Sequence, residues 1–158
     1  DVAARATPDY RIDVADLEGW ERERGLIPDG AILLLRTGWG ERWPDRLSYL
    51  GTERTGPDAV AELHFPGIHP GAARWIIDQR NVAAVGIDTP SIDYGQSSGF
   101  EAHVIIYGAN IPGFENVANL DELPEASAFV VALPMKVAGG SGGPLRIVAF
   151  VPLTSEGS

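Results

Sequence analysis

Apolar residues near the start of the chain recur every three or four positions: Val14, Leu17 and Trp20. Asp13, just before them, can accept hydrogen bonds from the free amides of a first helical turn, and Gly25 suits the end of a helix. The pattern therefore predicts an amphipathic helix over residues 14–24.

Short apolar runs follow, separated by polar segments. Residues 31–39 form a run bounded by glycine and too short for a typical helix, which predicts a buried strand. Pro70 suits the first turn of a second helix, and the apolar segment 82–88 after that helix predicts another buried strand. The later chain predicts a short helix over 100–108. It also predicts two strands, 127–135 and 145–153, which flank a glycine-rich loop and precede a polar tail. This order of strands and helices predicts an α/β fold.

The segment 38–67 is rich in glycine, proline, tryptophan and charge, and its only regular pattern is a possible short helix over 44–50. Long irregular segments in compact domains are usually functional or lie at an interface. Trp39, Trp43 and Tyr49 therefore either line a pocket or partner surface, or simply pin the segment to the rest of the protein.

The length of 158 residues fits one domain, residues 1–158. A net charge of −10 without Lys/Arg clusters argues against binding to nucleic acid, and no apolar run approaches the roughly 20 residues that cross a bilayer. The chain is therefore expected to be soluble and not to bind membranes; its compartment stays open, with the cytoplasm favoured. With no cysteine, any metal ligands must be His, Asp or Glu.

Residues 99–116 place a histidine and two glutamates in an otherwise apolar stretch. A single histidine in an apolar segment is most often a core residue hydrogen-bonded to the backbone, and this is one interpretation of His103. Glu115, between Phe114 and Asn116, adds weight to a metal site, because a carboxylate in apolar surroundings needs a cation, an arginine or a metal as its partner. His103 and Glu115 are thus either satisfied core residues or two ligands of one metal ion.

The remaining candidate groups are less specific. His64 and His69 are five positions apart around a Phe-Pro-Gly turn, which is not the helical spacing of a metal pair, and His69 before Pro70 fits the entry to a helix. Asp88 ends a predicted strand, where α/β sheets tend to place functional groups. A Ser-His-Asp hydrolase that uses Asp88, Ser91 and Asp93 is conceivable, but no Gly-x-Ser-x-Gly sequence accompanies Ser91, and nothing in the sequence orients a histidine on it.

Several long stretches resemble the cyclase family, whose members include kynurenine formamidases and isatin hydrolases. They are GIDTPSID, FEAHVIIYGANIPGFENVANLDELP and ALPMKVAGGSGGPLRIVAFVP, together with IPDGAILLLRTGWGERW and HFPGIHPGAARWI earlier in the chain. The resemblance implies a swivelling β/β/α fold with a mixed sheet, of which this chain is the C-terminal portion. It also implies a Zn or Mn cofactor that activates water for attack on an amide, lactam or lactone.

The resemblance assigns roles to individual residues. It makes His103 and Glu115 metal ligands and suggests that Trp39, Asp88 and Ser91 approach the substrate. The family's His-x-Gly-Thr-His-x-Asp sequence, which carries the other ligands and a histidine for proton transfer, is absent. We therefore expect the general acid–base histidine to lie outside this chain, on a missing N-terminal segment or a separate chain. The start at Asp1 rather than Met agrees with such a processed or partial polypeptide.

The predicted function is hydrolysis of a small amide, lactam or lactone, of the aryl formamide or isatin type, by a metal-activated water. Its partners would be the small-molecule substrate, the missing segment and further copies in a homo-oligomer, as is common in the family. The alternative is a truncated, non-catalytic module that keeps the cyclase fold for binding or assembly.

Overall fold

The structure, a computed structural model, describes residues 1–152. The chain divides into two compact units, Asp1–Leu120 and Asp121–Ser158, and each is described by itself. The single domain over 1–158 stays a prediction. No helix in the described part of the chain is long and apolar enough to cross a membrane.

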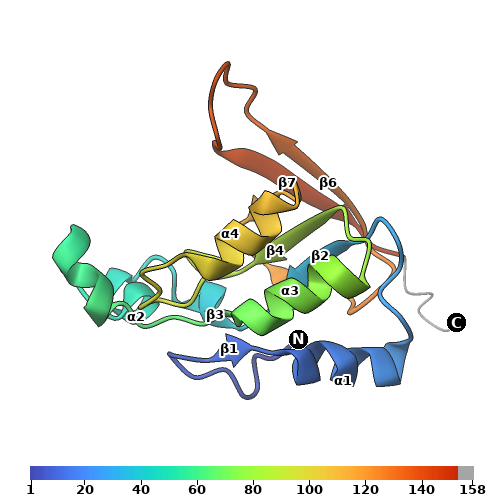
Figure 1. Ribbon diagram of the computed structural model, residues 1–158, viewed down its shortest axis with the longest axis horizontal. Helices are drawn as coiled ribbons and strands as arrows, with labels where there is room; N and C mark the ends of the chain where they lie inside the picture. The colour runs from blue at the N-terminus through green and yellow to red at the C-terminus, as the bar shows by residue number, and fades with distance from the viewer. Residues whose placement is uncertain (153–158) are drawn as a thin grey trace, which may run out of the picture. The chain divides into compact units, whose positions relative to one another are not determined.

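The first unit contains most of the helices and strands (Figure 1). In chain order they are β1 (Arg11–Ile12), α1 (Val14–Arg24), β2 (Ile32–Leu35), the 3₁₀ helix η1 (Trp39–Arg42), α2 (Arg46–Leu50), the 3₁₀ helix η2 (Pro57–Glu62), β3 (Gly67–Ile68), α3 (Pro70–Gln79), β4 (Ala84–Ile87), α4 (Glu101–Gly108) and β5 (Gly113–Phe114). A further 3₁₀ helix, η3 (Leu120–Glu122), begins at its last residue.

Helix α1 begins and ends where its local sequence predicts. The Asp13 side chain accepts a hydrogen bond from the amide of Asp16, and the Asp16 side chain accepts one from the amide of Asp13. This reciprocal pair satisfies two amides that a helix start leaves free. Gly25 follows with a φ of 92°, which favours glycine, and the predicted helix over 14–24 is confirmed.

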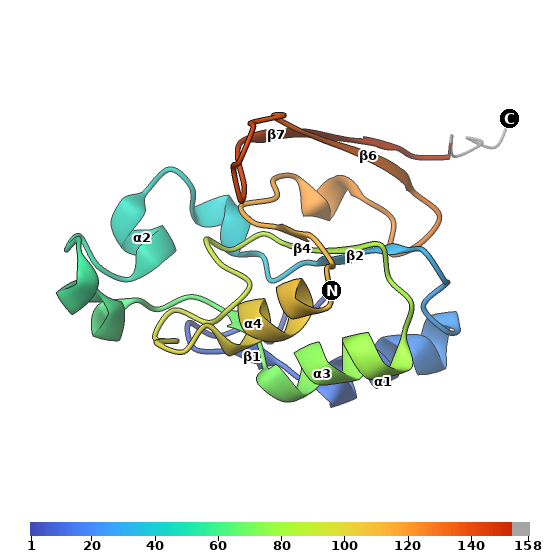
Figure 2. The same ribbon diagram turned by 45° about the horizontal axis from the view of Figure 1, so that its top comes forward.

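A three-stranded parallel sheet forms the centre of this unit, in the order β2-β4-β5. All four residues of β2 pair with β4, from Ile32 opposite Ala84 to Leu35 opposite Ile87. Strand β5 pairs with the other edge of β4, with Val85 opposite Gly113. Figure 2 shows α3 and α4 on one side of β2 and β4, and α3 also packs against α1. Because helices connect parallel strands in this unit, the predicted α/β class is confirmed.

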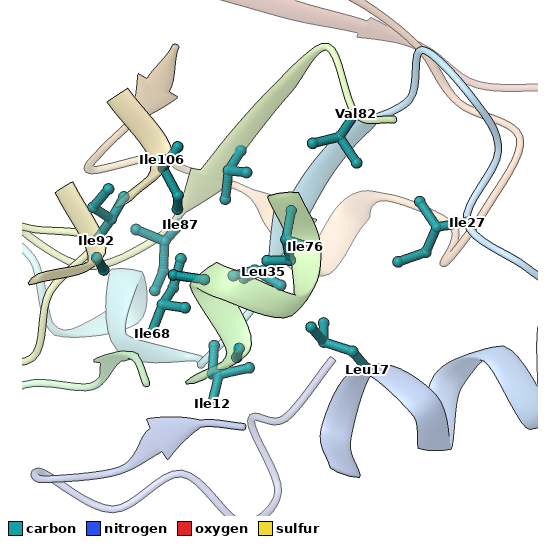
Figure 3. Close-up of a cluster of buried hydrophobic side chains, with 14 of the residues drawn as sticks. Ile12, Leu17, Ile27, Leu35, Ile68, Ile76, Val82, Ile87, Ile92 and Ile106 are labelled. Atoms are coloured by element: carbon teal, nitrogen blue, oxygen red, sulfur yellow. The ribbon is translucent and has the colours of Figure 1, made fainter. Parts of the chain in front are cut away.

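The core lies between these helices and the sheet (Figure 3). Ile76 of α3 and Ile106 of α4 are completely buried, and they join Leu35 of β2 and Ile87 of β4 in one apolar cluster. Strand β4 is buried along its whole length, which explains why its sequence is a continuous apolar run without polar alternation. A second, smaller cluster holds Trp39, Tyr49 and Phe65.

The second unit contains an antiparallel hairpin of β6 (Phe129–Pro134) and β7 (Leu145–Phe150). Phe129 pairs with Phe150 and Val131 with Val148, so these residues share one face of the hairpin. Both predicted strands are confirmed over these ranges, while position 153 and the predicted polar tail lie outside the described residues.

The sequence predicted only one of the short elements in and next to the long segment 38–67. The short helix predicted over 44–50 is present as α2. The two 3₁₀ helices and strand β3 had no periodic signal, because each is only two to six residues long.

Candidate active site

Two acidic residues follow directly after neighbouring parallel strands. Asp88 comes after β4, and Glu115 comes after β5. The carboxyl ends of parallel strands meet at one edge of the sheet, which is where α/β proteins usually place functional groups. The side chain of Glu115 keeps 29% of its surface exposed there, whereas Asp88 is buried.

The carboxylate of Asp88 binds Thr37, which lies just beyond the end of β2. It accepts hydrogen bonds from the Thr37 amide at 2.9 and 3.1 Å and from the Thr37 hydroxyl at 2.6 Å. Asp88 therefore ties the ends of β2 and β4 together, and its predicted contact with substrate stays a prediction.

His103, on α4, lies between two carboxylates. Its Nδ1 is 2.6 Å from Oδ2 of Asp93, and its Nε2 is 3.1 Å from Oε1 of Glu115. The Asp93 side chain is 3% exposed, while that of His103 is 23% exposed. The structure thus brings His103 and Glu115 together, as expected of two ligands of one ion, and adds a third residue that the sequence did not single out for this role.

The two carboxylates favour a proton on the imidazole. Hydrogen bonds from His103 to Asp93 and then to Glu115 raise the pKa of His103 to about 9, although burial opposes the shift. Burial by itself raises the pKa of Asp93, but hydrogen bonds from the His103 ring and from two backbone amides outweigh it and hold that pKa below its usual value. The positively charged form of the imidazole is therefore favoured between these two carboxylates.

The Glu115 side chain is held by a backbone amide, and a tyrosine ties together the segments around it. Its Oε1 accepts a hydrogen bond from the amide of Ile92 at 3.0 Å. The hydroxyl of Tyr49 lies 3.1 Å from the carbonyl oxygen of Asp88 and 3.0 Å from Oδ1 of Asn116, so it can donate to either acceptor. Tyr49 thereby connects the segment after β4 with the one after β5, beside Glu115.

Aromatic side chains flank the His103 ring. Phe100 and Tyr107 meet it edge to face, with ring centroids 5.9 and 5.0 Å away. Both are partly exposed, and Phe100 has a φ of 48°, in the left-handed region that few bulky residues adopt. Burial, and then the nearby Glu115 and Asp93, raise the pKa of Tyr107 to about 12, so its hydroxyl remains protonated at neutral pH.

Comparison with known proteins decides the family. The profile of the family described as "Putative cyclase" matches residues 1–94. The chain belongs to the cyclase family. The resemblance predicted from its sequence stretches is thereby confirmed.

Solved and curated relatives extend this likeness over the rest of the chain. Isatin hydrolase A from Ralstonia solanacearum matches 96% of this chain with a TM-score of 0.86 and 38% identity, which confirms the cyclase-type fold. The isatin hydrolase of Roseibium aggregatum is 33% identical over 93% of this chain, and the kynurenine formamidase of Polaromonas naphthalenivorans is 32% identical over 68% of it. The chain spans 58%, 55% and 46% of these three proteins, respectively.

The positions and chemistry of His103 and Glu115 show whether these two residues suit a divalent metal ion. Nε2 of His103 and Oε1 of Glu115 are 3.1 Å apart, a separation open to two ligands that each lie about 2 Å from one ion. Imidazole nitrogen and carboxylate oxygen are ligands that Zn and Mn accept. These two residues therefore fit part of a metal site. No group of three His, Asp or Glu side chains within residues 1–152 is arranged to hold an ion.

Trp39, another predicted site residue, makes contacts that hold the long segment 38–67 together. Trp39 is buried, and its indole N–H donates to the carbonyl oxygen of Tyr49 at 2.8 Å. Arg42 stacks on its outer side, 3.6 Å from the ring centroid. These contacts favour the interpretation that Trp39 and Tyr49 pin the long segment, whereas Trp43 is exposed. An approach of Trp39 to substrate stays a prediction.

The serine-hydrolase alternative gains no support from the position of Ser91. Its hydroxyl accepts a hydrogen bond from the amide of Asp93 at 3.2 Å. Both ring nitrogens of His103 already face carboxylates, so neither is left to activate a serine. The role of Ser91 in binding substrate stays a prediction.

The two remaining histidines lie outside this cluster. His69 is the first residue before α3, and its Nδ1 accepts a hydrogen bond from the amide of Gly71 at 3.0 Å. The interpretation of His69 as a helix-entry residue is confirmed. His64 lies 2.8 Å from both Asp9 and Gln96 on the surface.

Sequence reasoning missed the role of Asp93. A usable signal was present, since Phe100 precedes α4 where a capping side chain would be expected, so the helix needs an acceptor from elsewhere. Asp93, in the polar loop after β4, is that acceptor, through the amides of Ala102 and His103.

Proposed function

We propose that this chain is part of a metal-dependent hydrolase that cleaves a small aryl formamide, cyclic amide or lactone. The observation that carries the proposal is the pairing of His103 Nε2 with Glu115 Oε1 at the carboxyl edge of the parallel sheet. Its family membership and the names of its relatives, isatin hydrolase and kynurenine formamidase, support the choice of reaction.

The proposed role of these two residues is to hold Zn or Mn. A divalent ion bound there would supply hydroxide at neutral pH, because it would lower the pKa of a bound water toward about 7. His103 would bind through Nε2 and Glu115 through its carboxylate, whose position is fixed by the Ile92 amide. Because this carboxylate is fixed, the metal ion would be held beside the imidazole rather than in open solvent.

The substrate's ring would lie against the exposed aromatic side chains beside His103. Phe100 and Tyr107 offer apolar edges next to the reacting group, and such surfaces suit an aryl ring better than an aliphatic chain. We retain Trp39, Asp88 and Ser91 as proposed substrate-side residues, with Asp88 acting by shaping the loop it anchors.

The other ligands and the histidine for proton transfer are proposed to come from outside this chain, from an N-terminal segment or a separate chain. The chain covers little more than half of its isatin hydrolase relatives, so there is room for such a segment or chain as a partner. A homo-oligomer is proposed on the same grounds of family likeness.

Replacement of Glu115 by Gln in the complete protein tests the function. We expect the bound Zn or Mn to fall well below one equivalent and hydrolysis of an N-formyl aryl amine and of isatin to fall by at least about 100-fold, because an amide oxygen is a much poorer ligand. Glu23→Gln, on the exposed side of α1, is the matched control and should leave both unchanged. Unchanged metal content and hydrolysis in Glu115→Gln would remove the assignment.

A non-catalytic module is the rival function, and the absence of a three-ligand group within residues 1–152 favours it. Metal analysis of the purified protein separates the two. If the protein carries no Zn or Mn, and added metal neither binds nor produces hydrolysis, the module is the better description.

A further inference from the structure

Asp93 collects four hydrogen bonds at one buried carboxylate. Its Oδ1 accepts from the Ser97 hydroxyl at 3.2 Å and the Ala102 amide at 3.0 Å. Its Oδ2 accepts from the amide of His103 at 3.1 Å and faces the Nδ1 of the same residue at 2.6 Å. One side chain from the loop after β4 therefore holds both the first turn of α4 and the ring that this turn carries.

The two carboxylates around the ring differ in exposure, 3% for Asp93 and 29% for Glu115, so the two ring nitrogens are not equivalent. An ionised carboxylate can only accept hydrogen bonds, so Nδ1 of His103 must carry the proton in this contact. The opposite nitrogen, Nε2, then points at Oε1 of Glu115, 3.1 Å away. Histidines that bind metals almost always make this contact from their other nitrogen, and loss of the partner typically costs 10–100-fold in metal affinity.

We propose that Asp93 is the positioning residue of this site: it keeps the proton of His103 on Nδ1 and directs Nε2 toward Glu115, while it caps α4. The metal-binding consequence rests on the proposed function, but the orientation of the ring does not. Because the cap and the ring share one carboxylate, the start of α4 and the site are held by the same side chain.

Asparagine at position 93 cannot both cap α4 and keep the proton of the His103 ring on Nδ1. If its amide oxygen faces His103, its NH₂ group points at the amide of Ala102, so two donors meet and that capping hydrogen bond is lost. If its NH₂ group faces His103, it donates to Nδ1 and moves the ring proton to Nε2, which then cannot bind a metal. Asp93→Asn therefore tests the inference without a change in side-chain size.

The first measurement needs neither a variant nor a metal. We expect ¹⁵N-resolved NMR of the metal-free protein to show a proton on Nδ1 of His103 that exchanges slowly with water, because the buried Asp93 accepts it. In Asp93→Asn this resonance should disappear if the NH₂ group faces the ring, and should exchange faster if the neutral amide oxygen, a weaker acceptor, faces it. A ring whose Nδ1 proton exchanges as fast as that of a free histidine in the wild-type protein would overturn the proposal, whether or not a metal binds.

The second measurement is the affinity for Zn²⁺ or Mn²⁺ alone, in the complete protein. We expect Asp93→Asn to weaken binding 10–100-fold. Asp13→Ala is the matched control, because it removes the carboxylate cap of α1 without touching His103, and its affinity should stay within about twofold. Equal weakening in both variants would reduce Asp93 to a helix cap and overturn the positioning role.

The two proposals fail in different ways. If His103→Ala leaves metal binding unchanged, the proposed function fails, while the protected Nδ1 proton still decides whether Asp93 orients the ring. If His103→Ala abolishes binding but Asp93→Asn does not weaken it, the function stands and the positioning role is wrong.

Discussion

At the scale of single residues, the candidate site depends on a few polar contacts made by side chains in apolar surroundings. His103 is anchored on one side by the buried carboxylate of Asp93 and faces the partly exposed carboxylate of Glu115 on the other. The two ring nitrogens therefore have different surroundings, and only Nε2 lies on the more exposed side of the ring, where the proposed metal would bind.

Phe100 gives a prediction at the same scale. It combines an exposed ring beside His103 with a φ of 48°, so its backbone carries a strain that a Cβ causes and glycine avoids. We expect Phe100→Gly to be more stable than Phe100→Ala by about 1 kcal/mol, because only the alanine keeps the Cβ. Denaturant unfolding of the two variants checks this.

The same pair of variants separates strain from substrate binding. Both lose the aromatic edge, so both should raise KM for an aryl substrate by a similar factor despite their different stabilities. An alanine variant as stable as the glycine variant would show that the left-handed conformation at this position costs nothing.

At the scale of elements, an ion pair links helix α1 with the end of helix α3. Glu21 of α1 pairs with Arg80, which follows α3, and also accepts a hydrogen bond from the amide of Ile27 at 2.9 Å. Arg80 in turn stacks on Trp75, 4.2 Å from the ring centroid. One carboxylate thus links α1, the turn after it and the end of α3.

The pH dependence of stability tests this link. The hydrogen bond from Arg80 lowers the pKa of Glu21 from its ordinary value of 4.5. A group with a lowered folded pKa stabilises the folded state above its unfolded pKa, and this contribution is lost as the pH falls through the folded value. We expect Glu21→Gln to be less stable than wild type at pH 7, and the difference to shrink steadily below pH 4.5.

Thermal unfolding of both proteins between pH 7 and pH 3 measures the effect. Glu23→Gln, two positions along the same helix and exposed, controls for the loss of charge alone. A stability difference that stays constant over this range would mean that the pair with Arg80 contributes no pH dependence.

At the scale of the whole molecule, the two units differ in how their strands are protected. Strand β4 is buried and pairs with strands on both sides, and the amide of Val85 donates to the carbonyl oxygen of Pro112 at 3.0 Å. The β6–β7 hairpin has only two strands, and its Phe129 and Phe150 are 68% and 63% exposed. Two-stranded hairpins are marginally stable by themselves.

Hydrogen exchange should therefore separate the units. We expect the amides of β4 to exchange at least about tenfold more slowly than those of β6 and β7, because the central strand opens only with its unit. Mass spectrometry or NMR on the native protein measures this. Hairpin amides as protected as those of β4 would show that the hairpin is stabilised by contacts beyond its own two strands.

The regular elements were predictable because their signals are local. The Asp13 cap, the apolar runs of β2 and β4 and the entry of α3 at His69 each depend on residues a few positions apart. Strand β5 was not predictable, since two residues carry no period and become a strand only by pairing with β4. Asp93 was missed as a site residue for a similar reason, because its ring contact spans ten positions across a loop.

The sequence by itself determined the α/β class, most helix and strand positions and, through the resemblance, the family; it also predicted that His103 and Glu115 act as a pair. Only the tertiary structure decided what surrounds that pair. Thr37 meets Asp88 across 51 positions, and Tyr49 meets Asn116 across 67. Hydrogen bonds between such distant residues depend on how the strands are ordered in the sheet, and no local pattern of polar and apolar residues records that order.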